Sequence, residues 1–256
     1  MLFNDGGAYE TSMGVWSRLV GDVFIEWVKA DRNLKWLDVG CGNGAFSELI
    51  ARSCFPSHVD AIDPSPEQIE FARSRSDAKD VNFRIGDAMS IASSDDTFDI
   101  AVMALVIFFV PEPPKGVSEM VRVVKKNGLV SSYAWDTVNG GSPSKLITGH
   151  LTEMGFKPEA PPNPQVSEMT ALNELWSNAG LVNLRSDVIT VERKFKDIEE
   201  YWEISSLFPN IQKIVPQLSK SQITELKARM EKDLTVGKGG MLCQTARANA
   251  IVGTVI

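Results

Sequence analysis

The segment Leu37-Asp38-Val39-Gly40-Cys41-Gly42-Asn43-Gly44-Ala45-Phe46 places three glycines at alternate positions between an apolar run and a stretch with helical spacing. Glycine has no Cβ, so the backbone at Gly40, Gly42 and Gly44 can take positive φ, and a ligand can approach it closely. The first N–H groups of the following helix have no partner within that helix and can face the ligand. The segment therefore predicts a buried strand, a tight turn beside a ligand, and the start of a helix.

This loop alone is compatible with more than one kind of site. Gly40-x-Gly42-x-x-Ala45 also matches the looser dinucleotide-binding pattern G-x-G-x-x-G/A, and a glycine-rich turn without a ligand looks the same. Residues 58–63 predict a second strand that ends in Asp63, roughly twenty residues further on, where a ribose hydroxyl would be held. Residues 81–88 predict a third strand that ends in Asp87. A carboxylate there can accept a hydrogen bond from the exocyclic amine of adenine, and a dinucleotide site has no standing need for it.

Four motifs follow one another along the chain: Asp38-Val39-Gly40-Cys41-Gly42-Asn43-Gly44, Ile62-Asp63-Pro64-Ser65, Gly86-Asp87-Ala88 and Phe98-Asp99-Ile100-Ala101-Val102. This series resembles the class I S-adenosylmethionine-dependent methyltransferases, and in particular the branch that methylates small molecules, including ubiquinone and menaquinone precursors. The resemblance covers residues 38–135. It implies an α/β, Rossmann-like fold with a seven-stranded, mostly parallel sheet, helices on both faces and an antiparallel last strand.

The resemblance also implies where the cofactor S-adenosyl-L-methionine, released as S-adenosyl-L-homocysteine, would bind. In similar methyltransferases an N-terminal segment closes over the cofactor, and Tyr9, Trp16, Ser17 and Arg18 match its pattern. Arg18 could pair with the methionyl carboxylate and Tyr9 could lie near the sulfonium, or Tyr9 and Trp16 could simply pack the helix against the sheet. The expected cofactor-binding residues are Tyr9, Trp16, Arg18, Gly40, Cys41, Gly42, Asp63, Pro64, Ser65, Gly86, Asp87, Ala88, Met103, Ala104 and Leu105.

The apolar run of residues 98–110 predicts a parallel strand that is covered on both faces. Many relatives carry histidines where this chain has Phe108-Phe109, so the imidazole that is usual near the site is missing. Phe108, Trp135 and Trp202 are expected to bind the substrate in an apolar pocket, although each could instead be ordinary core. The acceptor is expected to be small and partly aromatic or aliphatic rather than polymeric.

Two segments are interpreted as insertions that form a substrate cap within one methyltransferase domain of residues 1–256. Residues 137–166 are rich in glycine and proline, and residues 195–240 have helical character. Residues 181–191 should form the sixth strand and residues 247–256 the last strand. A helix over residues 115–125 should stop at residues 126–128, with Gly128 as a left-handed cap.

The composition places limits on cellular setting and partners. A formal net charge of −7 over 256 residues, with no long basic run, argues against a nucleic-acid substrate. No apolar run approaches the ~20 residues of a membrane span, and the first residues lack a signal-peptide pattern. Cys41, Cys54 and Cys243 have neither metal-ligand nor disulfide spacing. We therefore expect a cytoplasmic protein with a small-molecule acceptor, no nucleic acid and no membrane span, and an oligomeric state that is left open.

The chemistry expected from the resemblance is an in-line displacement at the methyl carbon of a sulfonium. Alignment of nucleophile, carbon and sulfur can supply up to ~7–11 kcal/mol of the barrier, and an acceptor that must lose a proton also needs a base. Asp136 and His150 are weak candidates for that base, because Asp136 could only hold a strand end and His150 could be solvated. No catalytic residue is assigned. A metal is not expected, because Asp136 would be a lone ligand.

Two other functions stay open on these residues. A non-catalytic module that binds S-adenosylmethionine would account for the missing histidines. A nucleotide-dependent oxidoreductase could use the same glycine loop, but it would give Asp87 no specific contact. The leading prediction is a methyltransferase that acts on a small, partly apolar acceptor.

Overall fold

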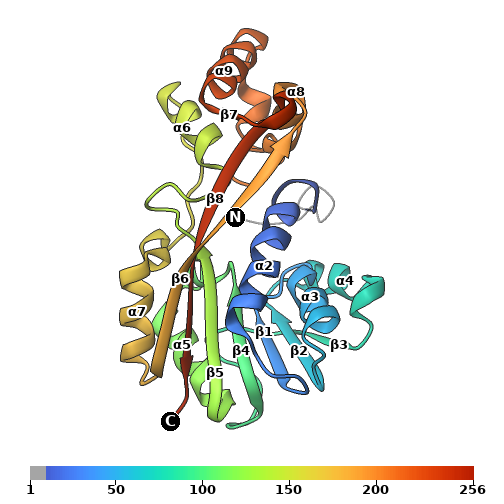
Figure 1. Cartoon of the computed structure of the whole chain (residues 1–256), viewed down its shortest axis with the longest axis vertical. Helices are drawn as coiled ribbons and strands as arrows, with labels where there is room; N and C mark the ends of the chain where they lie inside the picture. The colour runs from blue at the N-terminus through green and yellow to red at the C-terminus, as the bar shows by residue number, and fades with distance from the viewer. Residues whose placement is uncertain (1–9) are drawn as a thin grey trace.

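Five parallel strands form the centre of the sheet in the computed structural model, which describes residues 10–256 (Figure 1). Most residues of the three central strands, β2, β1 and β4, are buried, because helices cover both faces of the sheet there. The five strands are β1 (Lys35–Val39), β2 (His58–Asp63), β3 (Val81–Ile85), β4 (Phe98–Ala104) and β5 (Val124–Trp135).

The strands lie in the order β3-β2-β1-β4-β5-β8-β6. β8 (Leu242–Thr254) runs antiparallel between β5 and β6 (Val182–Phe195), which confirms the predicted mostly parallel sheet with an antiparallel last strand. A two-residue strand that was not predicted, β7 (Thr235–Val236), pairs with β8. The strand order reverses between β1 and β4, and such a reversal leaves a crevice at the carboxyl ends of the two strands.

Right-handed crossovers determine which face of the sheet each helix covers. The path β1, β2, β3 advances in one direction along the sheet, whereas β4 and β5 advance in the other. α3 and α4 therefore lie on one face and α5 on the opposite face, with α2 beside α3 and α7 beside α5. These helices are α2 (Val15–Val28), α3 (Ala45–Ser53), α4 (Pro66–Arg73), α5 (Pro113–Val123) and α7 (Met169–Asn178).

The turn between α5 and β5 differs from the prediction. The helix ends at Val123, before the predicted residue 125, and Asn127 rather than Gly128 takes the left-handed conformation, with φ 64°. Gly128 is needed for space, because a Cβ there would lie 2.5 Å from Val124 Cγ1 and 2.7 Å from the carbonyl oxygen of Asp99. The predicted left-handed cap at Gly128 was therefore wrong.

β6 and β8 continue as a two-stranded ribbon beyond the carboxyl end of β5 (Figure 1). The last pair of β5 and β8 joins Trp135 to Ala248, whereas β6 and β8 stay paired as far as Phe195 and Leu242. The boundaries predicted for these strands, 181–191 and 247–256, were wrong at this end. Their mutual backbone pairing extends them past the main sheet.

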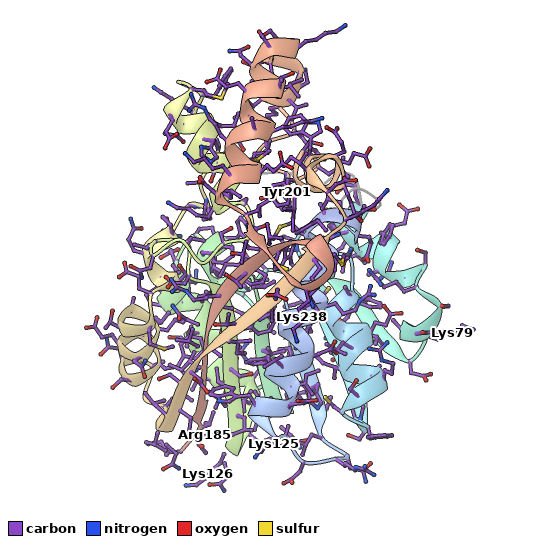
Figure 2. The ribbon with its side chains drawn as sticks, turned by 45° about the horizontal axis from the view of Figure 1, so that its top comes forward. Lys79, Lys125, Lys126, Arg185, Tyr201 and Lys238 are labelled. Carbon is purple, nitrogen blue, oxygen red and sulfur yellow. The ribbon has the colours of Figure 1, made fainter. Side chains whose placement is uncertain are left out.

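Three helices gather around the end of this ribbon: α6 (Lys145–Glu153), α8 (Ile198–Ser205) and α9 (Lys220–Asp233). α9 packs against both α6 and α8, and Leu151, Tyr201 and Met230 are buried between them. Figure 2 shows Tyr201 within this group of helices, while Lys125 and Lys126 lie at the opposite end of the molecule. The two predicted insertions thus supply one helical group above the carboxyl ends of the strands.

The fold predicts unequal roles for two buried tryptophans. Trp176 of α7 donates its indole N–H to the Val130 carbonyl at 3.0 Å, whereas the N–H of Trp36 has no acceptor among the described residues. Trp176→Phe should lower the free energy of unfolding by about 1–2 kcal/mol more than Trp36→Phe, because only the former removes a hydrogen bond to a buried carbonyl. Urea denaturation of both variants tests this, and equal losses would contradict it.

Candidate active site

A cavity of about 430 Å³ opens at the carboxyl ends of β1, β2 and β4, where the strand order reverses. The glycine loop after β1 forms one wall, and the ends of β2 and β4 form others. We call it the larger cavity. Its lining residues are Ser17, Gly40, Cys41, Gly42, Asn43, Ala45, Phe46, Asp63, Pro64, Ser65, Gln68, Gly86, Asp87, Ala88, Ala104, Leu105, Val106, Phe109, Val110, Pro111, Tyr133 and Pro162.

The glycines of the loop have different physical roles. Gly40 has φ 79°, and a Cβ there would lie 2.5 Å from Val106 Cγ1, so glycine is required for contact with the protein itself. Gly42 has φ 52°, and a Cβ there would meet nothing within 4 Å. Because Gly42 lines the larger cavity, its missing side chain leaves open space for a ligand.

The N–H groups of the loop donate to protein acceptors. Gly40 and Cys41 both donate to the Ile62 carbonyl, at 2.7 and 2.9 Å. The N–H of Ala45, the first residue of α3, donates to Asn43 Oδ1 at 3.2 Å. The expectation that the first N–H of this helix faces a ligand was therefore wrong at Ala45, because the Asn43 side chain caps it.

Asp63 joins the glycine loop to the end of β2. Its Oδ2 accepts from Gly42 N and its Oδ1 accepts from Ser65 N, both at 2.9 Å. Burial raises the pKa of the Asp63 carboxyl, and the two backbone hydrogen bonds oppose that rise. Each carboxylate oxygen has a second lone pair, so Asp63 can still accept hydrogen bonds from a ligand in the larger cavity.

Asp87 follows β3 and also lines the larger cavity. Its Oδ1 accepts from Met89 N at 2.8 Å, which orients the carboxylate within a short turn. The side chain is exposed, unlike that of Asp63. The two strand-end acids predicted from the sequence therefore border the same cavity.

A second cavity of about 100 Å³, the smaller cavity, adjoins the first. Leu105 and Phe109 line both cavities, and the rings of Phe108 and Phe109 meet edge to face at 4.7 Å. Leu105 has φ 62°, an uncommon conformation for a residue with a side chain. The lining residues are Met13, Leu105, Phe108, Phe109, Trp135, Thr137, Ser142, Ser144, Glu159, Pro161, Pro209 and Asn210.

The first insertion is tied directly to the floor of these cavities. Asn163 donates from its backbone N to the Phe108 carbonyl at 3.0 Å and from Nδ2 to the Val110 carbonyl at 2.7 Å. These bonds hold the neighbouring Pro161 beside the smaller cavity and Pro162 beside the larger one.

Most of the predicted cofactor-binding residues meet at the larger cavity, but several do not. Trp16 and Met103 are fully buried in the core, and Arg18 is paired with Glu10 at 3.6 Å. None of these three lines either cavity. Tyr9 lies outside the described residues. The predicted residues that do line the larger cavity are Gly40, Cys41, Gly42, Asp63, Pro64, Ser65, Gly86, Asp87, Ala88, Ala104 and Leu105.

Among the predicted substrate-binding residues, Phe108 and Trp135 line the smaller cavity, and Trp202 lies outside its lining. The ammonium of Lys227 sits 5.7 Å from the Trp202 ring centroid, within the upper helical group. Trp202 is therefore placed against α9 rather than against either cavity.

The two candidate bases are not among the residues that line the cavities. Asp136 is 7% exposed, accepts from Asn139 Nδ2 at 2.9 Å and lies 3.5 Å from Arg247. His150 of α6 lies 3.0 Å from Asp233 of α9. Neither residue lines the larger or the smaller cavity.

Several residues that line the larger cavity were not predicted from the sequence. Tyr133 packs against Phe46 at 5.5 Å, and these residues come from β5 and α3, which are far apart in the sequence. Tyr133 lies near the carboxyl end of its strand, a signal that could have identified it. Asn43, within the glycine loop, was equally accessible to sequence reasoning. The other unpredicted lining residues, such as Gln68 and Pro162, have no local signal that distinguishes them.

Asp38 of β1 is a buried carboxyl next to the glycine loop. Ser47 Oγ donates to its Oδ2 at 2.6 Å, and Oδ1 has no hydrogen-bond partner among the described residues. Burial raises the pKa of Asp38 to about 7; the Ser47 hydrogen bond lowers it, and the nearby Asp63 charge raises it further. The group therefore titrates near neutral pH.

Within residues 10–256, no group of three or more His, Cys, Asp or Glu side chains is arranged to hold a metal ion. No helix in that part of the chain is both long enough and apolar enough to cross a membrane.

Comparison with known proteins finds related sequences. The family model described as a methyltransferase domain matches residues 37–132. A demethylmenaquinone methyltransferase of Renibacterium salmoninarum is 34% identical over 201 residues, which cover 71% of this chain and 81% of the relative. The chloroplastic 2-methyl-6-phytyl-1,4-hydroquinone methyltransferase 2 of Oryza sativa subsp. japonica is 37% identical over 98 residues, or 38% of this chain and 28% of that protein. The match to the plant relatives spans only about a third of their length, 28–36%.

Solved structures share the architecture. The YcgJ protein of Bacillus subtilis superposes with a TM-score of 0.61 at 18% sequence identity, covering 92% of this chain and 97% of that one. At this level of identity the likeness establishes the fold alone. The fold class predicted from the sequence is confirmed.

The contrast between the loop glycines predicts unequal effects on stability. Gly40→Ala and Gly42→Ala each place a side chain at positive φ, which should lower the free energy of unfolding by about 1–2 kcal/mol. At position 40 the new Cβ also collides with Val106, which should add about 1–3 kcal/mol. Urea denaturation should therefore show Gly40→Ala as the less stable variant, and the reverse order would contradict this role of the loop.

The raised pKa of Asp38 predicts a pH-dependent stability. Between the unfolded value of 3.8 and the folded value of about 7, the native state holds a proton that the unfolded state releases. The contribution of Asp38 to the free energy of unfolding should fall as the pH rises through this window, by up to about 4 kcal/mol. Asp38→Asn should remove that part of the slope. Chemical denaturation across the window tests this, and parallel profiles for the two proteins would contradict it.

Proposed function

Because the chain belongs to the class I S-adenosylmethionine-dependent methyltransferases, we propose that it transfers a methyl group from S-adenosylmethionine to a small, partly apolar acceptor. The observation that carries the proposal is the pair of adjoining cavities, which share Leu105 and Phe109. One cavity has the polar groups that suit a nucleoside, and the other is mainly apolar. A donor in the first and an acceptor in the second would meet at the shared wall.

The larger cavity fits the cofactor on structural grounds. Its volume of about 430 Å³ lies within the range of ~300–1,000 Å³ that is usual for ligand pockets. The open space at Gly42 allows a ligand to contact the main chain. Asp63 would accept from the ribose hydroxyls, and Asp87 would accept from the adenine amine. Ala104 and Leu105 would border the methionine part.

When bound, the cofactor supplies an electrophilic methyl group on a sulfonium. The chain's own contribution is orientation and exclusion of water. Leu105 and Phe109 would align the two ligands at the shared wall, and the proline-rich segment that Asn163 holds would cover them. Holding reactants in such an arrangement can supply ~7–11 kcal/mol of the barrier.

Glu159 is the carboxylate that lines the smaller cavity, but it is poorly suited to act as a base. Lys213 donates to it at 2.7 Å and, with its positive charge, holds the pKa of Glu159 below the usual value. Asp136 and His150 lie outside the cavity linings. Catalysis by proximity and orientation therefore remains our proposal, with no assigned base.

The acceptor that we propose is a small molecule with an aromatic or aliphatic body. Phe108, Phe109 and Trp135 give the smaller cavity apolar walls, and Thr137 and Asn210 add hydrogen-bonding groups. The relatives' names refer to a phytyl hydroquinone and to demethylmenaquinone, which have such bodies. We further propose that residues 137–166 and 195–240 form the substrate cap of a single methyltransferase domain. The comparisons lend no support to a non-catalytic module or an oxidoreductase.

Loss of the β2 carboxylate should weaken cofactor binding. Asp63→Ala removes a charged acceptor for the ribose hydroxyls, and it should weaken S-adenosylhomocysteine binding by about 1.5–3 kcal/mol, measured by isothermal titration calorimetry. Asp60→Ala is the matched control, because Asp60 lies in the same strand but pairs with Arg84 and His58 outside the cavity. The affinity of the Asp60→Ala variant for S-adenosylhomocysteine should stay at the wild-type value.

Two outcomes would count against the proposal. Unchanged affinity in a folded Asp63→Ala protein would remove Asp63 from the site. Tighter binding of NAD than of S-adenosylhomocysteine by the wild-type chain would favour the oxidoreductase instead.

A further inference from the structure

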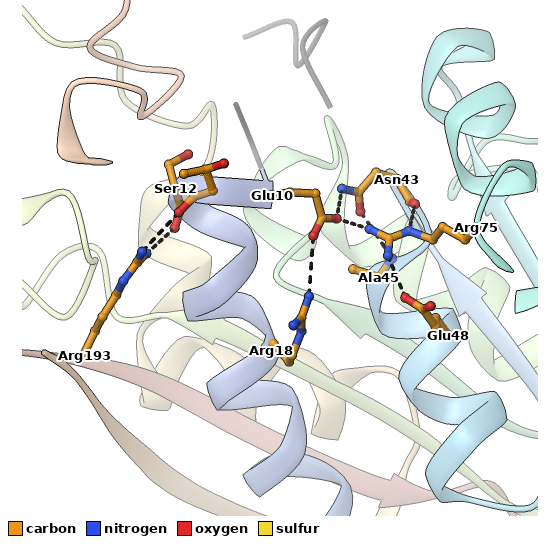
Figure 3. A network of polar contacts seen from close by, with 9 residues as sticks. Glu10, Ser12, Arg18, Asn43, Ala45, Glu48, Arg75 and Arg193 are labelled. Carbon is orange, nitrogen blue, oxygen red and sulfur yellow. Dashed lines mark hydrogen bonds and ion pairs between the residues drawn. The ribbon is translucent and has the colours of Figure 1, made fainter. Parts of the chain in front are cut away.

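A cluster of charged and amide groups joins the start of the described chain to the glycine loop (Figure 3). It consists of Glu10, Asn43, Glu48 and Arg75, and we call it the latch. Arg75 lies just after α4, and its side chain is only 11% exposed. The latch combines residues from four separate segments around one guanidinium.

The guanidinium of Arg75 contacts Asn43, Glu48 and Glu10, and it also lies 5.8 Å from the centroid of the Phe71 ring. Its Nε donates to the Asn43 carbonyl at 2.6 Å, and its Nη1 donates to Glu48 Oε2 at 2.6 Å. Its Nη2 pairs with Glu10. One side chain therefore holds the main chain of the glycine loop, the first turns of α3 and the N-terminal segment together.

Glu10 is bound to the loop by a second contact. Its Oε1 also accepts from Asn43 Nδ2 at 2.7 Å, while Asn43 Oδ1 caps the N–H of Ala45. Its Oε2 lies 3.6 Å from Arg18. Asn43 lines the larger cavity, so the contacts of Glu10 end on a wall of that cavity.

The segment that Glu10 begins borders both cavities. Residues Glu10–Gly14 form a single π-helical turn. This conformation is rare in proteins, and where it occurs it is often at a functional site. Met13 lines the smaller cavity, and Ser17, one turn further on, lines the larger one. On the other side of the turn, Arg193 of β6 donates to the carbonyls of Ser12 and Thr11, at 2.9 and 3.2 Å (Figure 3).

We propose that Arg75 is a positioning residue and that the latch controls exchange of the cofactor. The inference rests on the proposed function, because it assumes that the larger cavity holds S-adenosylmethionine. Arg75 touches the loop through Asn43 and does not itself line the cavity. It fixes the loop carbonyl and, through Glu10, the turn that carries Met13 toward the acceptor side.

The coupling between latch and cofactor is reciprocal. A latch that favours the arrangement of the loop that binds the cofactor must itself be stabilised when the cofactor binds. The Glu10–Arg75 pair is partly buried, with side chains 25% and 11% exposed, so solvent screens it less than a surface pair. Breaking it should therefore raise the rate at which the cofactor leaves.

The test uses Glu10→Gln, Arg75→Gln and the double variant, with S-adenosylhomocysteine as the probe. Each single variant should bind S-adenosylhomocysteine about 5- to 20-fold more weakly than the wild-type chain, with most of the change in the dissociation rate. The double variant should be little worse than the worse single one, because both remove the same pair. Calorimetry gives the affinities, and surface plasmon resonance gives the dissociation rates. Arg75→Lys keeps the charge but loses the forked contacts, and it should fall between wild type and Arg75→Gln.

Arg122→Gln is the matched control. Arg122 of α5 also binds several partners at once, including Glu119, Asp95 and the Ile91 carbonyl, but it does not line either cavity. It should lower thermal stability while leaving the affinity for S-adenosylhomocysteine unchanged.

The outcomes separate this inference from the proposed function. A wild-type chain that does not bind S-adenosylhomocysteine overturns both. A wild-type chain that binds it, with Glu10→Gln folded and equally tight, overturns the latch alone. Additive losses in the double variant, or losses no larger than in Arg122→Gln, would also overturn the latch.

Discussion

The hydrogen bond from the Gly42 N–H to Asp63 is the contact on which the site depends. It joins the loop after β1 to the end of β2, and Gly40 and Cys41 reinforce it by donating to the Ile62 carbonyl. The loop is thus held by hydrogen bonds to the end of β2. The absence of a side chain at Gly42 leaves open space, so the cavity wall there is main chain that the bond to Asp63 holds in place. Binding a ligand to a loop that is already held in place costs less free energy than ordering the loop when the ligand binds.

The reversal of strand order places a second site next to the first. β4 lies beside β1, so its carboxyl end, with Leu105 at positive φ, reaches the same crevice as the glycine loop. The Leu105 N–H donates to the Tyr133 carbonyl at 2.8 Å, which ties this uncommon conformation to β5. An uncommon backbone geometry persists where its surroundings hold it in place, and here the bond to Tyr133 does so beside the two cavities that Leu105 lines.

Sequence reasoning succeeded where a signal is local. The glycine loop and the acids Asp63 and Asp87 follow predicted strands directly, and parallel strands bring their carboxyl ends to one edge, so these residues meet in the structure. Prediction from the sequence failed where long-range packing determines the position of a residue or the length of a strand. Trp202 and His150 lie in the group of helices α6, α8 and α9, and their positions follow from how α9 packs against α6 and α8. The length of the ribbon of β6 and β8 depends on pairing between distant segments, which periodicity in one segment cannot reveal.

The two cavities differ in how many of their lining residues the family model matches. The family model ends at residue 132, and it includes the glycine loop and both strand-end acids of the larger cavity. Most residues of the smaller cavity lie beyond it, namely Trp135, Thr137, Ser142, Ser144, Glu159, Pro161, Pro209 and Asn210. The residues that the family model matches therefore make up most of the lining of the larger cavity and little of the lining of the smaller one. In the function that we propose, side chains of residues 137–166 and 195–240 would contact the acceptor, while the main chain of the glycine loop would hold the donor.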